Sequence, residues 1–538
     1  MNRKFLRVVF AVIAAVLMFG AYAPAGYAAT FSERLSELQG VVSIDVIVQT
    51  PDKSGDVAFA EKYVVWFKQP IDWQNPDMGT FLQRAEIGFM DWDAVNVMNV
   101  GGYFLYDETF IMDDRCELAK MYSSNYINVE YRYFGKSIPD GLDERSTALW
   151  EYLTDENSAN DFHSIMEQLK SILSGTWVFT GDSKGGQMTN LFSYYYPNDA
   201  DAYVAYVAPF CDGAEDDRLM DAMYTSIGAE RYGEAQAKAY RDMMLEFQVE
   251  AIRNRDYLQP RLIKAPSSED AKIYPFRTVS RDFESLIVNH TEGVWQYDQD
   301  FDSHEKILNM PREDDPNTEQ NEKEEYLAAM LALLSEDLAS DGYSYFPYIV
   351  QGDTENGNYT IKFKYLREAV EREGLSLVVT EEDEKKFTAR CTFTEEQQKL
   401  FTFDPYMRNE MLNWSHTTQS NVIMIYGTSD PWYFVRLPDV DDNPNVHIFT
   451  SPLSHNVKIN NMPNDKKAQI TGLLNEWLMY DAESPSEPEP ESPSEPESPS
   501  EPVQSGLGSP SGGCDSGMFS GLGLAGVLLV LSRRKIRR

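Results

Sequence analysis

Residues 177–209 read WVFTGDSKGGQMTNLFSYYYPNDADAYVAYVAP, and this stretch decides how the rest of the chain is interpreted. It begins with a short apolar run, residues 177–180, which predicts a buried strand. A glycine-flanked turn around Ser183 follows, and residues 187–196 then have the length of a helix that a proline ends. A second apolar run, residues 203–208, predicts the next strand. The stretch therefore predicts a strand, a tight turn, a helix and a strand in that order.

The turn has the pattern G-x-S-x-G, from Gly181 to Gly185, and between two strands it is typical of the nucleophile elbow of α/β-hydrolases. In that elbow the serine hydroxyl projects above the sheet, and the glycines let strand and helix approach without Cβ clashes. The backbone N–H of Lys184 opens the helix and can point at a developing oxyanion. We expect the Lys184 side chain on the surface. The alternative is an ordinary turn with an uninvolved serine.

The length and charge of the chain limit its fold and its partners. At 538 residues the chain is too long for one compact core but suits an α/β domain with a large insertion. The formal net charge of −39 argues against nucleic-acid binding, which needs a cationic surface. No H-E-x-x-H motif, no Cys/His cluster and no phosphate-binding loop occurs in the sequence, so we expect neither a metal nor a cofactor.

The N-terminal residues 1–29 predict a secretory signal peptide. Arg3, Lys4 and Arg7 precede the apolar run 8–19, and small residues follow up to a plausible cleavage point at Ala28 or Ala29. We therefore expect the mature chain to work outside the cytoplasm.

Three of the four cysteines lie in the globular part of the chain: Cys116, Cys211 and Cys391. At most one internal disulfide can form among them, and a bond between Cys116 and Cys211 is possible. The alternative is that all three are small buried apolar side chains.

Residues 30–210 predict the first part of a hydrolase core. Strand and helix patterns alternate there, which favours a mostly parallel sheet covered by helices on both faces. Gly102 and Tyr103 follow a strongly apolar predicted strand, so a backbone N–H of either residue could form the second half of an oxyanion hole; a plain turn is the alternative. Asp161 is a plausible N-cap for a helix that precedes the elbow.

The following residues 211–415 are mainly helical, and residues 218–253 have a helical pattern throughout. We interpret this segment as a cap inserted over the strand ends, where ligands bind in open α/β sheets. A separate domain with its own site is the alternative. The α/β pattern resumes over residues 416–482, the second part of the core.

The C-terminal residues differ in composition from the core. Residues 483–510 form a Ser/Pro/Glu-rich segment that predicts a disordered stalk. Residues 511–538 contain Gly-Gly-Cys514, an apolar run and a basic cluster. This order resembles the tripartite sorting signals of bacterial surface proteins, which implies processing or lipid attachment at Cys514. A simple membrane anchor is the alternative. Both predict a protein held at the cell surface.

A serine nucleophile needs a histidine base, and the base needs a carboxylate that orients it. Of the six histidines, only His455 lies in the loop directly after the last predicted core strand. Asp430 lies in the loop after the preceding predicted strand. The chain order Ser183, Asp430, His455 matches that of α/β-hydrolases. We therefore predict that Ser183 attacks the substrate, that His455 transfers the proton, and that Asp430 holds the imidazole.

Several motifs together resemble a known family. TGDSKGG at residues 180–186 and AYVAP at residues 205–209 resemble the secreted bacterial serine tripeptidyl aminopeptidases. That family is similar to lysosomal prolyl carboxypeptidase and dipeptidyl peptidase. Further matching motifs lie at residues 67–72, 79–84, 129–137, 429–432 and 454–456. The resemblance runs from about residue 63 to residue 477 but does not extend segment by segment through the cap.

The resemblance implies a peptidase that removes short peptides from free N-termini, so peptides are the expected substrates. Such an enzyme must bind an α-ammonium group, for which a buried carboxylate is the natural partner. The T-E-x-G stretch at residues 354–357 makes Glu355 the candidate, and a solvated surface glutamate is the alternative. Trp432, Tyr133 and Tyr348 could line subsites, although aromatic side chains more often belong to a core.

Other functions stay open at this point. An esterase or lipase could use the same fold. A prolyl-type carboxypeptidase would need a cationic pocket for the substrate's carboxylate. A binding module without catalysis is the fourth reading, against which the intact triad argues.

Overall fold

The computed structural model describes residues 29–47, 59–106, 116–298, 300–311, 318–338, 344–385 and 389–480. Their central feature is a nine-stranded sheet with the order β1-β2-β3-β5-β4-β6-β7-β10-β11. The strands are β1 (Val41–Ile47), β2 (Glu61–Pro70), β3 (Thr80–Phe89), β4 (Asn96–Val100), β5 (Asn125–Val129), β6 (Trp177–Asp182), β7 (Ala202–Tyr206), β10 (Val422–Gly427) and β11 (Val446–Ser451).

The strands β5, β4, β6, β7, β10 and β11, which are neighbours in this order, run parallel to one another. At one side of the sheet, β1, β2 and β3 pair antiparallel, and β3 also pairs antiparallel with β5. The central strands are rich in apolar residues, and every residue of β5, β7 and β10 is buried. Strands buried on both faces have this character because helices cover both sides of a parallel sheet. The turn after β6 lies in the middle of the sheet. This is the α/β-hydrolase architecture predicted from the sequence.

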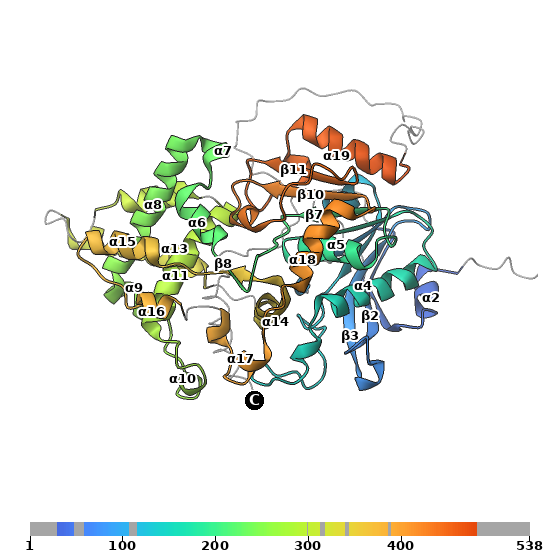
Figure 1. The fold of residues 1–538 in the computed structure, drawn as a ribbon, viewed down its shortest axis with the longest axis horizontal. Helices are drawn as coiled ribbons and strands as arrows, with labels where there is room; N and C mark the ends of the chain where they lie inside the picture. The colour runs from blue at the N-terminus through green and yellow to red at the C-terminus, as the bar shows by residue number, and fades with distance from the viewer. Residues whose placement is uncertain are drawn as a thin grey trace, which may run out of the picture.

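Successive strand residues point to opposite faces and enter different cores. Met98, Phe179 and Met424 pack with α4 (Asp155–Lys170), α5 (Lys184–Tyr195) and α18 (Tyr406–Thr417). Val97, Val178 and Ile423 pack on the other face with α3 (Glu117–Met121) and α19 (Asn464–Trp477). Figure 1 shows α4 and α5 lying across the strands on the side toward the viewer.

The chain between β7 and α18 is mainly helical and gathers to the left of the sheet in Figure 1. Its helices are α6 (Arg218–Thr225), α7 (Ala229–Tyr232), α8 (Glu234–Arg253), α9 (Arg255–Leu262), α10 (Asp270–Ile273), α11 (Val279–Gly293), α12 (Phe301–Leu308), α13 (Gln320–Glu336), α14 (Phe346–Gln351), α15 (Lys364–Arg372), α16 (Glu381–Glu384) and α17 (Gln397–Leu400). Two short strands, β8 (Glu215–Asp216) and β9 (Asn358–Tyr359), pair within it. We call this segment the cap; the domain boundaries given above stay predictions.

Residues 218–253 are helical almost throughout, as expected, and form α6, α7 and α8, with Gly228 and Gly233 flanking α7 at φ of 82° and 75°. One expectation about a helix was wrong. Asp161 lies inside α4 and not at its start. The N-cap of α4 is Thr154, whose side chain accepts a hydrogen bond from the N–H of Asn157.

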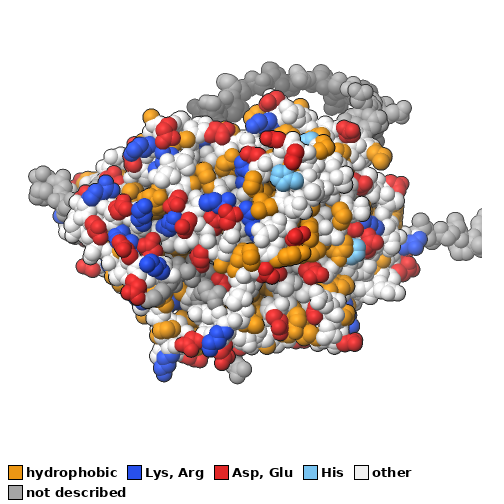
Figure 2. Space-filling model, viewed as in Figure 1, with side chains coloured by type: hydrophobic (Ala, Val, Ile, Leu, Met, Phe, Trp, Pro, Cys, Tyr) orange, Lys and Arg blue, Asp and Glu red, His pale blue; other side chains and the backbone are white. Residues whose placement is uncertain are grey.

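The described cysteines Cys116, Cys211 and Cys391 are free thiols, and all three are buried. The alternative of small buried apolar side chains therefore describes them, and Cys116 and Cys211 are not bonded. The predicted signal peptide, the stalk and the segment around Cys514 fall outside the described residues, except for Ala29. Among the helices that are described, none is both long and apolar enough to cross a membrane. Acidic and basic side chains are interspersed over the face seen in Figure 2.

Candidate active site

Ser183 lies at the turn between β6 and α5 with φ 55° and ψ −120°, a backbone conformation that costs free energy in any residue but glycine. The turn is tight because β4 ends against it. A Cβ at Gly185 would lie 1.9 Å from the carbonyl oxygen of Val100, and one at Gly181 would lie 2.4 Å from it. Only glycine fits at these two positions. The sequence pattern G-x-S-x-G thus has a direct steric reason here.

The turn after β4 packs against the same elbow. Gly102 has φ 78°, and a Cβ there would lie 2.6 Å from the backbone nitrogen of Gly185. The backbone of Gly102 and the first turn of α5, which begins at Lys184, are therefore in contact. This is the arrangement in which backbone N–H groups from two loops can face one oxyanion.

Asp430 and His455 come together from the loops after β10 and β11. Asp430 Oδ2 lies 2.6 Å from Nδ1 of His455, and Asp430 Oδ1 accepts a hydrogen bond from the N–H of Trp432 at 3.1 Å. An ionised carboxylate only accepts hydrogen bonds, so the proton is assigned to Nδ1 of His455. Its Nε2 is buried and has no hydrogen-bond partner within the described ranges. Nε2 is therefore free to accept a proton.

Ser183 and His455 line one cavity of about 170 Å³. Four other predicted site residues also line this cavity: Lys184, Tyr103, Trp432 and Tyr348. Gly102 itself does not line it, but its neighbour Gly101 does. Tyr133 does not line the cavity: it is buried in the core, and its hydroxyl donates to the carbonyl of Leu149. Glu355 does not line it either, although its neighbour Asn356 does.

Two π-helical segments of the cap form part of the cavity wall: η3 (Val294–Asp298) through Gln296 and η4 (Gly352–Asn356) through Asn356. Such segments occur often at functional sites because they redirect side chains within a helix. The carbonyl of Gln296 also accepts a hydrogen bond from the backbone N–H of His455, at 2.9 Å. The cap therefore supports the loop that carries the predicted base.

The side chain of Tyr103 lines the cavity together with Ser183. The rings of Phe134, Tyr345 and Tyr348 surround the ring of Tyr103 at centroid distances of 5.7 to 6.0 Å and fix its position. Burial raises the pKa of the Tyr103 hydroxyl, so that it stays a neutral donor. The sequence analysis had considered only the backbone N–H of Tyr103.

Glu292, at the end of α11, is a cavity residue that the sequence analysis missed. Its side chain is 3% exposed, and Oε1 accepts a hydrogen bond from the indole N–H of Trp432 at 3.1 Å. No hydrogen bond to Oε2 is found in the part of the chain that the structure describes. Burial, helped by the negative charge of Asp430, raises the pKa of the Glu292 carboxyl to about 8. No motif marks this glutamate, because only the packing of the cap brings it to the cavity.

Lys184 also differs from expectation, since its side chain is buried and not on the surface. Its Nζ lies 3.3 Å from the ring centroid of Tyr131. Glu355 faces away from the cavity: its Oε2 accepts a hydrogen bond from the N–H of Asp155, at 2.7 Å.

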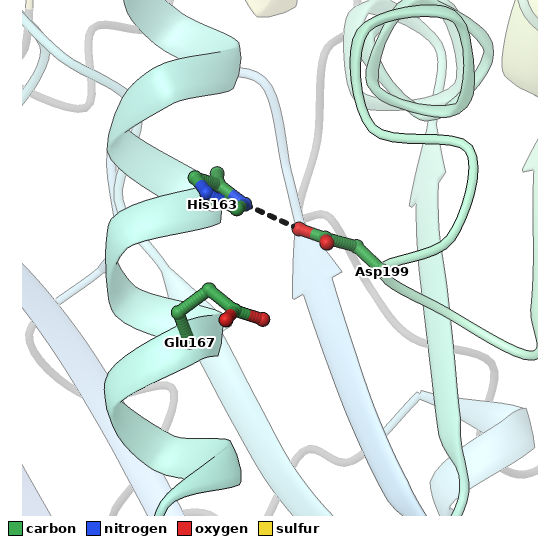
Figure 3. A group of neighbouring side chains, drawn as sticks. All are labelled: His163, Glu167 and Asp199. Atoms are coloured by element: carbon green, nitrogen blue, oxygen red, sulfur yellow. Dashed lines mark hydrogen bonds and ion pairs between the residues drawn. The ribbon is translucent and has the colours of Figure 1, made fainter.

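One group of side chains among those described has metal-ligand geometry: the ligand atoms of His163, Glu167 and Asp199 lie within 4.8 Å of one another. Figure 3 shows His163 and Glu167 on α4 turned toward Asp199. The ammonium of Lys170 lies 2.9 Å from Glu167 and 3.6 Å from Asp199, so a cation already contacts both carboxylates. The group does not line the cavity around Ser183.

Comparison with known proteins gives one family. The family model described as PS-10 peptidase S37 matches residues 33–494. The chain is 25% identical over 375 residues to the prolyl tri/tetrapeptidyl aminopeptidase of Streptomyces mobaraensis, which covers 69% of each protein. It is also 28% identical over 169 residues to the lysosomal Pro-X carboxypeptidase of Mus musculus, covering 29% of this chain and 34% of that protein.

Solved structures resemble the chain more distantly. Proline iminopeptidase from Mycobacterium smegmatis is 12% identical, with a TM-score of 0.34, over 77% of this chain and all of that one. Esterase E22 is 11% identical, with a TM-score of 0.33, over 81% of this chain and 99% of that one.

Proposed function

The chain belongs to the PS-10 peptidase S37 family and is a serine peptidase, and on that premise we propose that it releases tripeptides, or similar short peptides, from free N-termini. The observation that carries the proposal is the position of Glu292, which lines the same cavity as Ser183 and His455. The similarity to a protein named prolyl tri/tetrapeptidyl aminopeptidase also supports the release of short peptides from the N-terminus.

Glu292 suits the binding of a substrate's α-ammonium group. Its carboxyl is buried, and one oxygen has no hydrogen-bond donor among the described residues. With a pKa of about 8 it is mostly protonated in the free enzyme at neutral pH. A positive charge within about 4–6 Å favours the ionised carboxylate, so an arriving ammonium can displace that proton. The resulting buried ion pair would fix the N-terminus of the peptide.

The cationic side chains that line the cavity are already engaged. Lys458 is paired with Asp182, and the ammonium of Lys184 lies against the ring of Tyr131. A carboxypeptidase would need such a cation for the substrate's carboxylate. The charge distribution therefore favours an aminopeptidase over the prolyl-type carboxypeptidase considered above.

The proposed reaction passes through an acyl-enzyme. Ser183 Oγ attacks the carbonyl carbon while its proton moves to Nε2 of His455, and Asp430 stabilises the imidazolium. The oxyanion accepts hydrogen bonds from the N–H of Lys184 and from that of Gly102 or Tyr103. His455 then gives its proton to the nitrogen of the leaving peptide as the C–N bond breaks. Water attacks the acyl-enzyme in the same way and releases the short peptide.

The test uses a tripeptide with a chromogenic C-terminal leaving group, with its N-terminus either free or acetylated, beside a short-chain ester. Cleavage of the free form alone, lost in Ser183→Ala, is the expected result. Equal cleavage of the acetylated form would refute recognition of the N-terminus. Turnover of the ester without peptide turnover would instead indicate an esterase, and no turnover would leave a binding module.

We also propose that the mature enzyme acts outside the cytoplasm, as a cell-surface protein held by its C-terminal segment. The basic start and apolar run of residues 1–29 and the Gly-Gly-Cys514 segment support this location. Mass spectrometry of the surface fraction is expected to find a mature N-terminus at residue 29 or 30. An intact Met1 in a cytoplasmic fraction would contradict the proposal.

A further inference from the structure

Two histidines face each other in the interior of the cap. Nε2 of His290, on α11, lies 2.7 Å from Nε2 of His304, on α12. The two side chains are 4% and 1% exposed, so solvent does not satisfy these nitrogens. The ring of Phe247, on α8, packs against both imidazoles, at centroid distances of 5.4 and 4.7 Å. The reaction proposed above does not use either histidine.

The outer nitrogens of the two rings show where their protons lie. Nδ1 of His290 lies 2.6 Å from Oδ2 of Asp337, which follows α13 and is 5% exposed. Nδ1 of His304 lies 2.7 Å from the backbone carbonyl oxygen of Asp300. An ionised carboxylate and a carbonyl oxygen only accept hydrogen bonds, so the protons are assigned to the two Nδ1 atoms, which donate.

This assignment decides what the two Nε2 atoms need. A neutral imidazole with a proton on Nδ1 has only a lone pair on Nε2, and two such lone pairs at 2.7 Å would repel each other. One additional proton between the two Nε2 atoms turns the contact into a charge-assisted hydrogen bond. The histidine pair then carries one positive charge, which the adjacent carboxylate of Asp337 balances.

The surroundings fit one shared proton and not two. Burial, together with the charge of His290, lowers the pKa of His304 to about 4, so the pair takes up no second proton near neutral pH. The charged groups nearest to the pair are carboxyl groups on three elements: Asp337 after α13, Asp300 at the start of α12 and Glu292 on α11 itself. From α8 the pair meets the apolar ring of Phe247, and Glu250, one turn further on, is paired with Arg253 at 3.1 Å.

The hydrogen bond between the histidines closes a loop that forms part of the substrate site. Between His290 and His304 the chain leaves α11, passes through η3 and enters α12. Three residues of this loop line the catalytic cavity: Glu292, Gln296 and Tyr297. A shift of α11 against α12 would therefore move the proposed receptor for the substrate's ammonium group.

The same loop contacts the catalytic base. The ring of Tyr297 lies 5.4 Å from the imidazole of His455, centroid to centroid. The backbone carbonyl of Tyr297 accepts a hydrogen bond from the hydroxyl of Ser454 at 3.4 Å, beside the bond from the N–H of His455 to the carbonyl of Gln296. The two ends of this loop are joined by the histidine pair alone among the side-chain hydrogen bonds of the described residues between α11 and α12.

We infer that His290 and His304 are positioning residues: one proton shared between their Nε2 atoms holds α11 against α12 and thereby keeps Glu292 in place along the cavity. Loss of this proton breaks the hydrogen bond, so the binding of the free N-terminus weakens as the pH rises. This inference rests on the proposed function, because the position of Glu292 matters in this way only if it binds the substrate's ammonium group.

The shared proton itself is tested by NMR of the full chain with 15N-labelled histidine, which contains six histidines. At pH 6 we expect a downfield, slowly exchanging proton that couples to two histidine nitrogens, because it lies between both Nε2 atoms. The Nδ1 protons of His290 and His455 each couple to one nitrogen only, so they are not confused with it. The signal should be absent in His304→Gln and should disappear from the wild type as the pH rises.

Two substitutions at position 304 separate the need for a proton from the need for a side chain of this size. His304→Gln presents an amide N–H to Nε2 of His290 and needs no extra proton, whereas His304→Leu presents no donor. At pH 6 we expect kcat/KM for the free tripeptide to fall about tenfold in His304→Leu and less than about threefold in His304→Gln. His416→Gln is the matched control, because His416 is exposed and paired with Asp442 at the surface.

The pH profile distinguishes this role from a merely structural one. The ratio of kcat/KM in His304→Gln to that in the wild type should rise from below one at pH 6 to above one at pH 9, because only the wild type loses its hydrogen bond. The titrations of the substrate's ammonium group, of Glu292 and of His455 occur in both proteins and cancel in the ratio. The corresponding ratio for His416→Gln should stay constant.

Three results would overturn the inference: no proton coupled to two histidine nitrogens in the wild type, equal losses in His304→Gln and His304→Leu, or a ratio that does not change between pH 6 and pH 9. Labelling of Ser183 by a fluorophosphonate shows whether each variant has folded. If His304→Leu does not fold, the NMR signal and the ratio for His304→Gln still decide. A wild type that shows the shared proton and is labelled, but cleaves no free tripeptide, would mean that the proposed function has failed.

Discussion

The indole N–H of Trp432 lies 3.1 Å from Oε1 of Glu292, so the loop that begins at Asp430 is hydrogen-bonded to a carboxyl group of the cap. The continuation of the same cap helix accepts a hydrogen bond from the backbone N–H of His455 through Gln296. One cap element therefore contacts both loops that carry the predicted acid and base. It also carries the carboxyl that we propose for binding the substrate's N-terminus. The same cap element therefore supports both the proposed binding of the substrate's N-terminus and the proposed proton transfer.

Replacing Glu292 with glutamine removes the charge but keeps the acceptor for Trp432. We expect kcat/KM for the free tripeptide to fall about 10²-fold, because a buried charge-assisted contact to the ammonium group is lost. Any residual cleavage of the acetylated tripeptide should not change. Glu355→Gln is the matched control, and it should keep the preference for a free N-terminus. If only Glu355→Gln lost that preference, Glu355 and not Glu292 would be the residue that binds the substrate's ammonium group.

The raised pKa of Glu292 has a consequence for stability. The folded chain holds this proton up to about pH 8, whereas the unfolded chain releases it near pH 4.5. Between these values the unfolded state binds fewer protons, so the free energy of unfolding falls as the pH rises. At about 1.4 kcal/mol per pKa unit, the cost at alkaline pH is roughly 5 kcal/mol.

Glu292→Gln lacks this cost, so we expect its melting temperature to exceed that of the wild type at pH 9. The difference should shrink toward pH 5, where the wild-type carboxyl is neutral in the folded state. Thermal unfolding followed by circular dichroism at pH 5 and pH 9 measures this difference in melting temperature. A variant that is less stable than the wild type at pH 9 would contradict a buried, uncompensated carboxyl at this position.

Much of the candidate site could be predicted from the sequence because its signals are local. The turn around Ser183 needs glycines for steric reasons that act within a few residues. Asp430 and His455 lie in the loops directly after β10 and β11, so the order of elements along the chain was enough to predict their positions. The structure brings Asp430 and His455 within 2.6 Å of each other, at the cavity that Ser183 lines.

The cap contributions could not be predicted, because they depend on contacts between distant segments. Glu292 and Trp432 are 140 residues apart in the sequence. Asp155 and Glu355 are 200 residues apart. No periodicity or motif encodes such pairs.

Tyr103→Phe tests the hydroxyl of a side chain that lines the cavity with Ser183, since the backbone N–H and the ring remain. We expect kcat to fall about 10²-fold, the usual effect of losing one donor to a developing oxyanion. KM should change by less than about threefold, because the edge-to-face contact of the ring with Phe134 persists. Tyr133→Phe is the control, because its hydroxyl contacts Leu149 in the core. Equal activity of Tyr103→Phe and wild type would restrict Tyr103 to its backbone role.

Asp161, first considered as an N-cap, is instead the partner of Arg132 in the core. Both side chains are fully buried, and Nε and Nη2 of Arg132 donate to the two carboxylate oxygens of Asp161 at 2.7 and 2.8 Å. The indole N–H of Trp73 donates to the same carboxylate at 2.8 Å. Removing one partner of such a pair leaves the other charge buried and unpaired, which costs about 3–5 kcal/mol.

We therefore expect Asp161→Ala to lower the free energy of unfolding in urea by about that amount. An N-cap would cost only about 1 kcal/mol, so the size of the loss separates the two roles. Thr154→Ala, at the real N-cap of α4, is the internal comparison and should show that smaller loss. Arg132→Met combined with Asp161→Leu removes both charges together and should recover part of the stability, because no charge is then left unpaired. A double variant less stable than Asp161→Ala would mean that the hydrogen bonds of Arg132 to the carbonyls of Ile71 and Tyr152 matter more than the ion pair itself.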